Sequence, residues 1–226
     1  SIGAGSNALE TDVGTISTLS ANGGTFITEA SALTIDRISM AAKRVSATGA
    51  STTLTALVQE DAVTQETATT PVGGATSALV IQTGGSLIVN AGTAGVTGTP
   101  ASGISAAGNL LLSASGNTSD LAFNASVSSS GGDISLSAGR DVLQNVVDAN
   151  TAGQIENKAA SASVDVYAGN AITMADGSVT STTNGAIRYE ATAGNITLGQ
   201  LQAGTGSAAV VATAGSILDT NDNNGN

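Results

Sequence analysis

The residues best suited to acid–base chemistry are Asp133, Arg140 and Asp141, which lie close together in the chain. A polysaccharide lyase or hydrolase needs converging carboxylates, or a basic side chain with a bound metal, beside a surface that holds the sugar. Asp133 also has a structural interpretation, because it follows a glycine and precedes an isoleucine. Other polar residues fill the same slot elsewhere: Asn109, Asn195 and Ser216. A carboxylate there accepts backbone hydrogen bonds in a turn, so a turn role is favoured and no catalytic residue is assigned.

Other catalytic residue types are scarce. The chain contains no histidine and no cysteine, which removes the usual general base near neutral pH, thiolate chemistry and disulfides. Tyr167 and Tyr189 are the candidates for stacking against a sugar, but we expect both to be buried or to lie on a coil face.

The Asn- and Asp-rich tail offers the oxygen ligands that Ca²⁺ prefers. Asp219, Asn221 and Asp222 are therefore candidate ligands of a weak calcium site. Gly225 does not occupy the sixth position counted from Asp219, as an EF-hand loop requires, and the Gly-Gly-x-Gly-x-Asp repeat of calcium-binding β-rolls is missing. A polar turn between coils is the favoured interpretation, and no other cofactor is expected.

Composition narrows the classes of partner. Seventeen acidic residues against six basic ones give a net charge of −11, so nucleic acid is not expected as a partner. No apolar run approaches the ~20 residues of a membrane span. Aromatic residues make up 2% of the chain, so the core must be narrow and built in thin layers of Ala, Val, Ile and Leu. The chain opens at Ser1 without Met, and we expect it to be a segment of a longer repetitive protein.

Glycine marks a repeat along the chain. Eleven of the 29 glycines are followed two residues later by Ile, Leu, Val or Phe, which is how a strand begins after a turn. In Gly132-Asp133-Ile134-Ser135-Leu136 and Gly194-Asn195-Ile196-Thr197-Leu198, apolar and polar residues then alternate with period two. This pattern predicts strands and does not fit a helix.

The spacing of these apolar anchors predicts a solenoid. Most intervals are 21–24 residues along the series Leu87, Leu110, Ile134, Ile155, Ile172, Ile196 and Ile217, the exception being 17 from Ile155 to Ile172. Such a unit matches one coil of a parallel β-helix, in which each coil is covered by its neighbours. The sequence therefore predicts an all-β parallel β-helix over residues 1–226 with about ten coils, and burial of Leu110, Ile134, Leu136, Ile196, Leu198 and Ile217 in aligned stacks.

Residues 36–66 depart from the repeat, because they hold 7 of the 23 charged residues and a single glycine. A loop or short helix that leaves the solenoid, or an irregular coil, is the favoured interpretation. A partner-recognition insertion is the alternative, since repeat proteins often carry function on such excursions.

The run Ile134-Ser135-Leu136-Ser137-Ala138-Gly139-Arg140-Asp141-Val142 resembles the haemagglutinin repeats of filamentous-haemagglutinin-like exoproteins. Gly194-Asn195-Ile196-Thr197-Leu198 and Gly215-Ser216-Ile217-Leu218-Asp219 are similar to the same repeats. The resemblance covers residues 80–220 and implies a right-handed parallel β-helix, the shaft of a giant bacterial adhesin. The family's secretion domain carries Asn-Pro motifs, whereas Pro71 and Pro100 both follow threonine, so this segment is expected to be shaft.

These observations predict a non-enzymatic structural or adhesive shaft segment of a secreted or surface-displayed bacterial protein, outside the cell or on its surface. The expected partners are flanking repeats or like chains that stack end to end into fibres, with host-surface or glycan contact as a further expectation. The alternative is a β-helix carbohydrate-active enzyme, a lyase or hydrolase.

Overall fold

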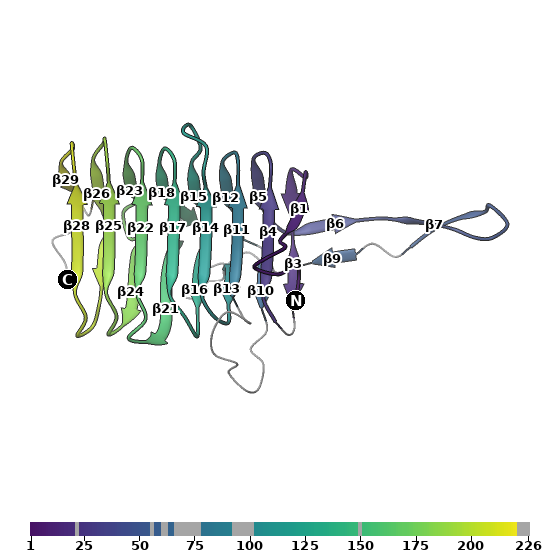
Figure 1. Cartoon of the computed structure of the whole chain (residues 1–226), viewed down its shortest axis with the longest axis horizontal. Coiled ribbons are helices and arrows are strands. Elements are labelled where there is room, and N and C mark those ends of the chain that lie inside the picture. The colour runs from purple at the N-terminus through teal and green to yellow at the C-terminus, as the bar shows by residue number, and fades with distance from the viewer. Residues whose placement is uncertain are drawn as a thin grey trace.

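The computed structural model describes residues 1–20, 23–54, 57–59, 63–65, 78–91, 102–148 and 151–220. Throughout these residues the regular elements are strands, and no helix occurs among them. Three long parallel sheets run the length of the molecule, and their strands follow each other like rungs (Figure 1). This arrangement is a parallel β-helix and confirms the predicted fold class.

Each long sheet takes one strand from successive coils. The first sheet contains β1 (Leu9–Thr11), β4 (Thr25–Glu29), β11 (Leu79–Thr83), β14 (Leu110–Ala114), β17 (Ile134–Ala138), β22 (Val164–Ala168), β25 (Ile187–Ala191) and β28 (Ala208–Ala212). The second contains β2 (Thr15–Ile16), β5 (Leu33–Ile35), β12 (Leu87–Val89), β15 (Leu121–Phe123), β18 (Val142–Gln144), β23 (Ile172–Met174), β26 (Ile196–Leu198) and β29 (Ile217–Asp219). The third contains β3 (Thr18–Ser20), β10 (Val63–Gln65), β13 (Ser102–Ala106), β16 (Ser126–Ser129), β21 (Gln154–Ala160), β24 (Val179–Thr183) and β27 (Gln200–Gln202).

The chain visits the three sheets in a fixed order, so each coil has three sides and three corners. Coil 1 is β1–β3, coil 2 is β4, β5 and β10, and the later coils follow in the same way to coil 8, which begins with β28 and β29. The described residues thus form eight coils where about ten were expected. Fewer coils fit because some connections leave the solenoid and use up chain length.

The core is a narrow column of aliphatic side chains that point inward from all three sheets. Leu110, Ile134, Leu136 and Ile196 are buried, as predicted. Leu198 is only partly buried against this core. Ile217 was predicted to be buried and is 52% exposed, because it lies in coil 8 and no further coil covers it.

The anchors predicted from the sequence belong to more than one sheet. Leu110 and Ile134 are register partners, and so are Ile196 and its two neighbours in the second sheet, Ile172 and Ile217. Leu87 instead lies beside Leu121 in the second sheet, and Ile155 lies beside Val127 in the third. The glycine signal begins strands of all three sheets, so the intervals that join different sheets are not coil lengths. Within the first sheet, true spacings run from 18 residues (Leu9 to Ile27) to 54 (Ile27 to Ile81).

The turn glycines are required by the close approach of successive coils. A Cβ atom placed on Gly139 would lie 2.1 Å from the Gly116 carbonyl oxygen, and one on Gly169 would lie 2.2 Å from the Gly139 oxygen. Both contacts are with backbone, which cannot move without separating the coils. Glycine is therefore selected here by the coil spacing, since its φ is not positive.

Among the described residues, two antiparallel excursions leave the coils at the corner between the second and third sheets. The shorter pairs β19 (Val146–Asp148) with β20 (Thr151–Ala152). The longer, which we call the arm, comprises β6 (Ile38–Met40), β7 (Lys43–Val45), β8 (Ser51–Thr53) and β9 (Leu57–Gln59). β6 pairs with β9 and β7 pairs with β8, so the described part of the excursion expected within 36–66 is built of strands and contains no helix. In Figure 1 the arm extends beyond coil 1 and continues the long axis of the solenoid.

The burial gradient along one ladder predicts unequal mutational costs. Ile196→Ala should lower the free energy of unfolding by ~2–5 kcal/mol, because it empties a fully covered site. Ile217→Ala removes the same atoms from the exposed end of the same ladder and should cost well under half as much. Urea denaturation followed by circular dichroism measures both, and equal losses would contradict the assigned core.

Candidate functional site: corner ladders and surface charge clusters

The predicted acid–base cluster does not assemble as a unit. Asp133 precedes β17 and Arg140 and Asp141 follow it, so Asp133 lies at one end of this five-residue strand and the other two lie at the opposite end. At ~3.3 Å per residue, the strand separates them by roughly 17 Å. The structure therefore brings Arg140 and Asp141 together and places Asp133 at a different corner of the solenoid.

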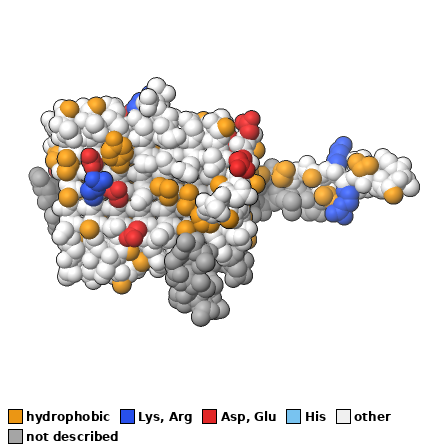
Figure 2. All heavy atoms as spheres, viewed as in Figure 1, with side chains coloured by type: hydrophobic (Ala, Val, Ile, Leu, Met, Phe, Trp, Pro, Cys, Tyr) orange, Lys and Arg blue, Asp and Glu red, His pale blue; other side chains and the backbone are white. Residues whose placement is uncertain are grey.

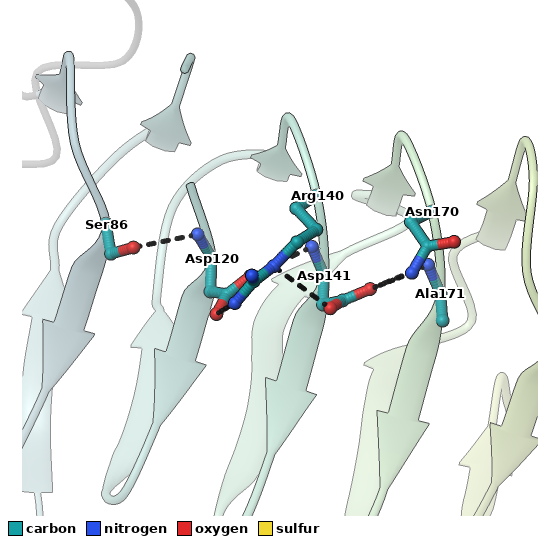
Figure 3. A network of polar contacts seen from close by, with 6 residues as sticks. All are labelled: Ser86, Asp120, Arg140, Asp141, Asn170 and Ala171. Carbon is teal, nitrogen blue, oxygen red and sulfur yellow. Dashed lines mark hydrogen bonds and ion pairs between the residues drawn. The ribbon is translucent and has the colours of Figure 1, made fainter. Parts of the chain in front are cut away.

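Arg140 and Asp141 belong to a network that crosses four coils at the corner between the first and second sheets (Figure 3). The Arg140 guanidinium binds the Asp120 carboxylate through two nitrogens, with an Nε–Oδ1 distance of 2.6 Å, and its Nε lies 3.3 Å from Asp141 Oδ2. The hydrogen bond and the charge of Asp120, together with the charge of Asp141, raise the pKa of Arg140 above its ordinary value. Asn170 donates to Asp141 Oδ1 from the next coil, at 2.7 Å.

The same corner carries a relay from side-chain oxygen to backbone amide. The Asp120 N–H donates to Ser86 Oγ at 3.0 Å, and the Asp141 N–H donates to Asp120 Oδ1 at 3.3 Å. The Ala171 N–H in turn donates to Asp141 Oδ1 at 3.0 Å. Each polar side chain thus accepts the turn N–H of the following coil. The carboxylates of Asp120 and Asp141 are occupied in holding coils together.

Asp133 does the same at the corner between the third and first sheets. Its Oδ1 accepts from the Ser163 N–H at 2.7 Å and from the Ser163 hydroxyl at 2.8 Å, while its own N–H donates to Asn109 Oδ1 at 3.0 Å. The acceptor role expected for Asp133 is present, but it acts between coils, 30 residues apart in the chain.

The third corner, between the second and third sheets, holds a ladder of side-chain amides. Asn145 donates to Asn124 at 2.8 Å, Asn124 donates to Asn90 at 2.9 Å, and Asn90 donates to Asp36 Oδ2 at 2.9 Å. Each of the four residues follows directly after a strand of the second sheet. Sequence reasoning missed this ladder, although a polar residue after an apolar strand end was a usable signal. The intervals of 54, 34 and 21 residues hid it from a search for one period.

Coils 1 and 2 are joined through a buried glutamate, Glu29, which is 1% exposed. Its carboxylate accepts from the Val13 N–H at 3.0 Å and from the Ser31 N–H and hydroxyl at 3.1 Å each. Burial by itself raises the pKa of this carboxyl. The hydrogen bonds from Val13, the Thr11 side chain and Ser31 outweigh that effect and lower the pKa of Glu29 to about 2. Glu29 is therefore a structural anion.

The two tyrosines have different surroundings. Tyr189 is buried in the core, where its hydroxyl lies 2.7 Å from Thr180 Oγ1 and donates to Gln144 Oε1 at 3.4 Å. Burial raises the pKa of Tyr189, so its hydroxyl remains protonated. Because the ring lies inside the core, it cannot stack against a sugar. Tyr167 is 38% exposed on the outer face of the first sheet, and its hydroxyl lies 3.2 Å from Thr192 Oγ1.

A second charge cluster lies near Tyr167 on that outer face. Arg188 Nε donates to Asp165 Oδ1 at 2.8 Å, and its Nη1 donates to Glu190. The hydrogen bond and charge of Asp165, followed by those of Glu190, raise the pKa of Arg188. Figure 2 shows a basic group between acidic ones on the near face of the solenoid. Sequence reasoning missed this cluster because Asp165 and Arg188 are 23 residues apart and meet only through the register of β22 and β25.

The calcium candidates fall mostly outside the described residues. Asp219 lies at the end of β29 and is exposed, whereas Asn221 and Asp222 are outside the described part of the chain. Within the described part, no group of three or more acidic residues is arranged to hold a metal ion. The same residues contain no helix that is long and apolar enough to cross a membrane.

Comparison of the chain with protein-family models, with curated proteins and with solved structures found no match.

The unusual acidity of Glu29 predicts a specific pH dependence. Its folded pKa of about 2 is below the usual 4.5, so the carboxylate stabilises the fold fully above about pH 4.5 and loses this effect as the pH falls towards 2. The shift corresponds to about 3 kcal/mol. Glu29→Gln should lower stability at pH 7 and show a smaller loss between pH 7 and pH 2.5 than the parent.

Urea denaturation at each pH measures this dependence. Glu10→Gln, a change at an exposed residue of the adjacent strand β1, is the control and should keep the parental pH profile. A Glu29→Gln variant whose stability falls as steeply as the parent's would refute the role assigned to Glu29.

The corner ladders predict that an acceptor oxygen matters more than charge. Asp133→Asn keeps an acceptor in the position where Asn109 already performs the same role, so its stability should stay within a few tenths of a kcal/mol of the parent. Asp133→Ala removes the acceptor from the Ser163 N–H and should cost about 1 kcal/mol. Equal losses in the two variants, measured by urea denaturation, would contradict the relay.

Proposed function

We propose that this chain is a non-catalytic shaft segment of a large secreted or surface-displayed bacterial protein, with a structural or adhesive role outside the cell or on its surface. The observation that carries the proposal is the repeated coil, in which three parallel sheets run from coil to coil along the molecule. Such an element extends by adding coils and supplies reach. The resemblance of residues 80–220 to filamentous-haemagglutinin-like repeats supports the same role.

The open ends support continuation of the coil into flanking repeats or like chains. Among the described strands, β1 and β28 each have a neighbour in the first sheet on one side only. In β28, the Ser207 carbonyl accepts from Ile187 and the Thr213 N–H donates to Ala191. The N–H and C=O groups of successive residues point to opposite sides of a strand. Those of Ala208, Val210 and Ala212 therefore point away from β25, towards the open end. Exposed Ile217 and Leu218 lie beside this edge, so a further coil would cover apolar surface as well as backbone.

The outer surface of the coils supports a passive shaft. The described bases of the coils, Arg140, Lys158 and Arg188, each form an ion pair with a neighbouring carboxylate. Aromatic and arginine side chains dominate strong protein interfaces, and on the coils these types are few or already engaged. Contact with a host surface or a glycan would then depend on parts of the parent protein that this segment holds at a distance.

A carbohydrate-active β-helix enzyme is the second candidate. It is favoured by exposed Tyr167, which lies near the carboxylates of Asp165 and Glu190 on one face. Arg188 binds both carboxylates, however, so both are already engaged on the surface of the coils. We therefore rank this function below the shaft.

End-to-end association should depend on the free backbone edge of β28. Ala208→Pro combined with Ala212→Pro removes two N–H groups that face the open end, where proline is tolerated because no ladder bond is lost. The variant should stay folded and associate at least tenfold more weakly than the parent. Sedimentation velocity over a concentration series measures the association. Ala208→Ser combined with Ala212→Ser keeps both N–H groups and should associate as the parent does. If the proline variant associates as strongly as the parent, stacking through this edge is contradicted.

A further inference from the structure

The arm differs in charge from the rest of the chain. From Ile38 to Gln59 the arm contains two basic residues, Lys43 and Arg44, and no acidic residue. The whole chain has six basic residues and 17 acidic ones, so a third of the basic residues lie on this one excursion. Figure 2 shows basic and apolar side chains on the arm and no acidic ones in view.

These basic side chains also differ in their pairing. The bases of the coils are held by Asp120, Asp165 and Glu156, at distances of up to 3.1 Å. Lys43 and Arg44 are exposed, and no ion pair joins them to any carboxylate in the described part of the chain. Two positive charges on a projecting hairpin of an acidic protein, without an ion pair in the described part of the chain, suit an acidic partner.

The position of the arm indicates which acidic surface it would meet. The arm leaves coil 2 between β5 and β10, at the corner between the second and third sheets, and extends past coil 1 along the stacking direction (Figure 1). A second copy that continued the coils beyond coil 1 would present its coils 8, 7 and 6 beside the arm. The same corner of coil 6 is the turn between β23 and β24, which contains Asp176.

The lengths agree. Lys43 is seven residues beyond Asp36, so at ~3.3 Å per residue it lies roughly 23 Å from coil 2. Coil 6 of the second copy would lie four coil spacings from coil 2, which is about 19 Å at ~4.8 Å per coil. The difference is shorter than a lysine side chain. Asp176 is exposed beside Gly177, and no hydrogen bond or ion pair engages its carboxylate in the described part of the chain.

We propose that the arm is an electrostatic clasp for a second copy of this chain, in which Lys43 and Arg44 bind the corner of the neighbour's coil 6 at Asp176. This inference rests on the end-to-end stacking proposed above and adds a specific contact to it. The stack itself supplies backbone hydrogen bonds, which any parallel coil can make. The clasp selects a neighbour whose acidic corner lies in register with the arm.

Charge reversal tests the clasp in the full chain. Lys43→Glu combined with Arg44→Glu changes exposed side chains without an ion partner, so the fold should be unaffected while the association constant falls at least tenfold. Adding Asp176→Lys to the same chain should restore most of the association. Lys158→Glu reverses a base on the coil body and should change association less than twofold. Sedimentation velocity at two salt concentrations gives each constant, and the arm-dependent part should weaken with salt.

The outcomes separate the clasp from the stack. If arm reversal leaves association unchanged while the proline variant of β28 abolishes it, stacking holds and the clasp is wrong. If arm reversal strengthens association, the arm is a guard against stacking and the clasp is again wrong. If arm reversal weakens association but the β28 prolines do not, the arm binds a second copy away from the coil end, and the end-to-end geometry is wrong. A parental chain that stays monomeric at all concentrations overturns both proposals.

Discussion

The hydrogen bonding of each coil to the next is the constraint from which the other features follow. Parallel strands in three sheets fix neighbouring coils at ~4.8 Å, and that spacing applies to the turns as well as to the strands. A turn has no room for a side chain directed at the coil below, as the 2.1 Å distance from a Cβ on Gly139 to the Gly116 oxygen shows. Inside the coils, the same spacing places similar side chains one above another in columns. This arrangement favours aliphatic residues of similar size.

The corners pose a second problem, because a turn N–H that faces the coil below has no strand to bond with. Two corners solve it with side-chain oxygens that accept the N–H, whereas at the third corner the side chains bond to one another. The choice of residue follows from what each position must do. Asn90 and Asn124 must both donate and accept, so each is an amide, whereas Asp36 at the end of the row only accepts and is a carboxylate. Where carboxylates line a corner, Arg140 binds Asp120 and Asp141 and offsets their repulsion. Residues that resemble a catalytic set in sequence are thus part of the scaffold.

The fold could be predicted from sequence because its signals are local. Glycine two residues before an apolar residue marks the start of a strand, and alternation in Ile134-Ser135-Leu136 marks the face that is buried. The assignment of strands to sheets could not be predicted, since Gly132, Gly153 and Gly194 precede strands of three different sheets. Contacts between coils were hidden for the same reason. Asp133 and Ser163 meet across 30 residues, and Asp165 and Arg188 across 23, so one period cannot align both.

The coils and the arm are under different constraints, which bears on where specificity can arise in such a molecule. A side chain on a coil is set by its column, because a change in size or charge there is felt by the coils on both sides. Arg188 illustrates the limit, since it is placed to bind Asp165 and Glu190 and has little left to offer a partner. A residue on the arm has no such neighbours, so Lys43 and Arg44 can keep an unpaired charge without cost to the stack. A solenoid also has no intrinsic length, because each coil can bond to a further coil in the same way. Recognition of a defined end must therefore come from an element outside the repeat, and the arm is the described element that reaches past coil 1.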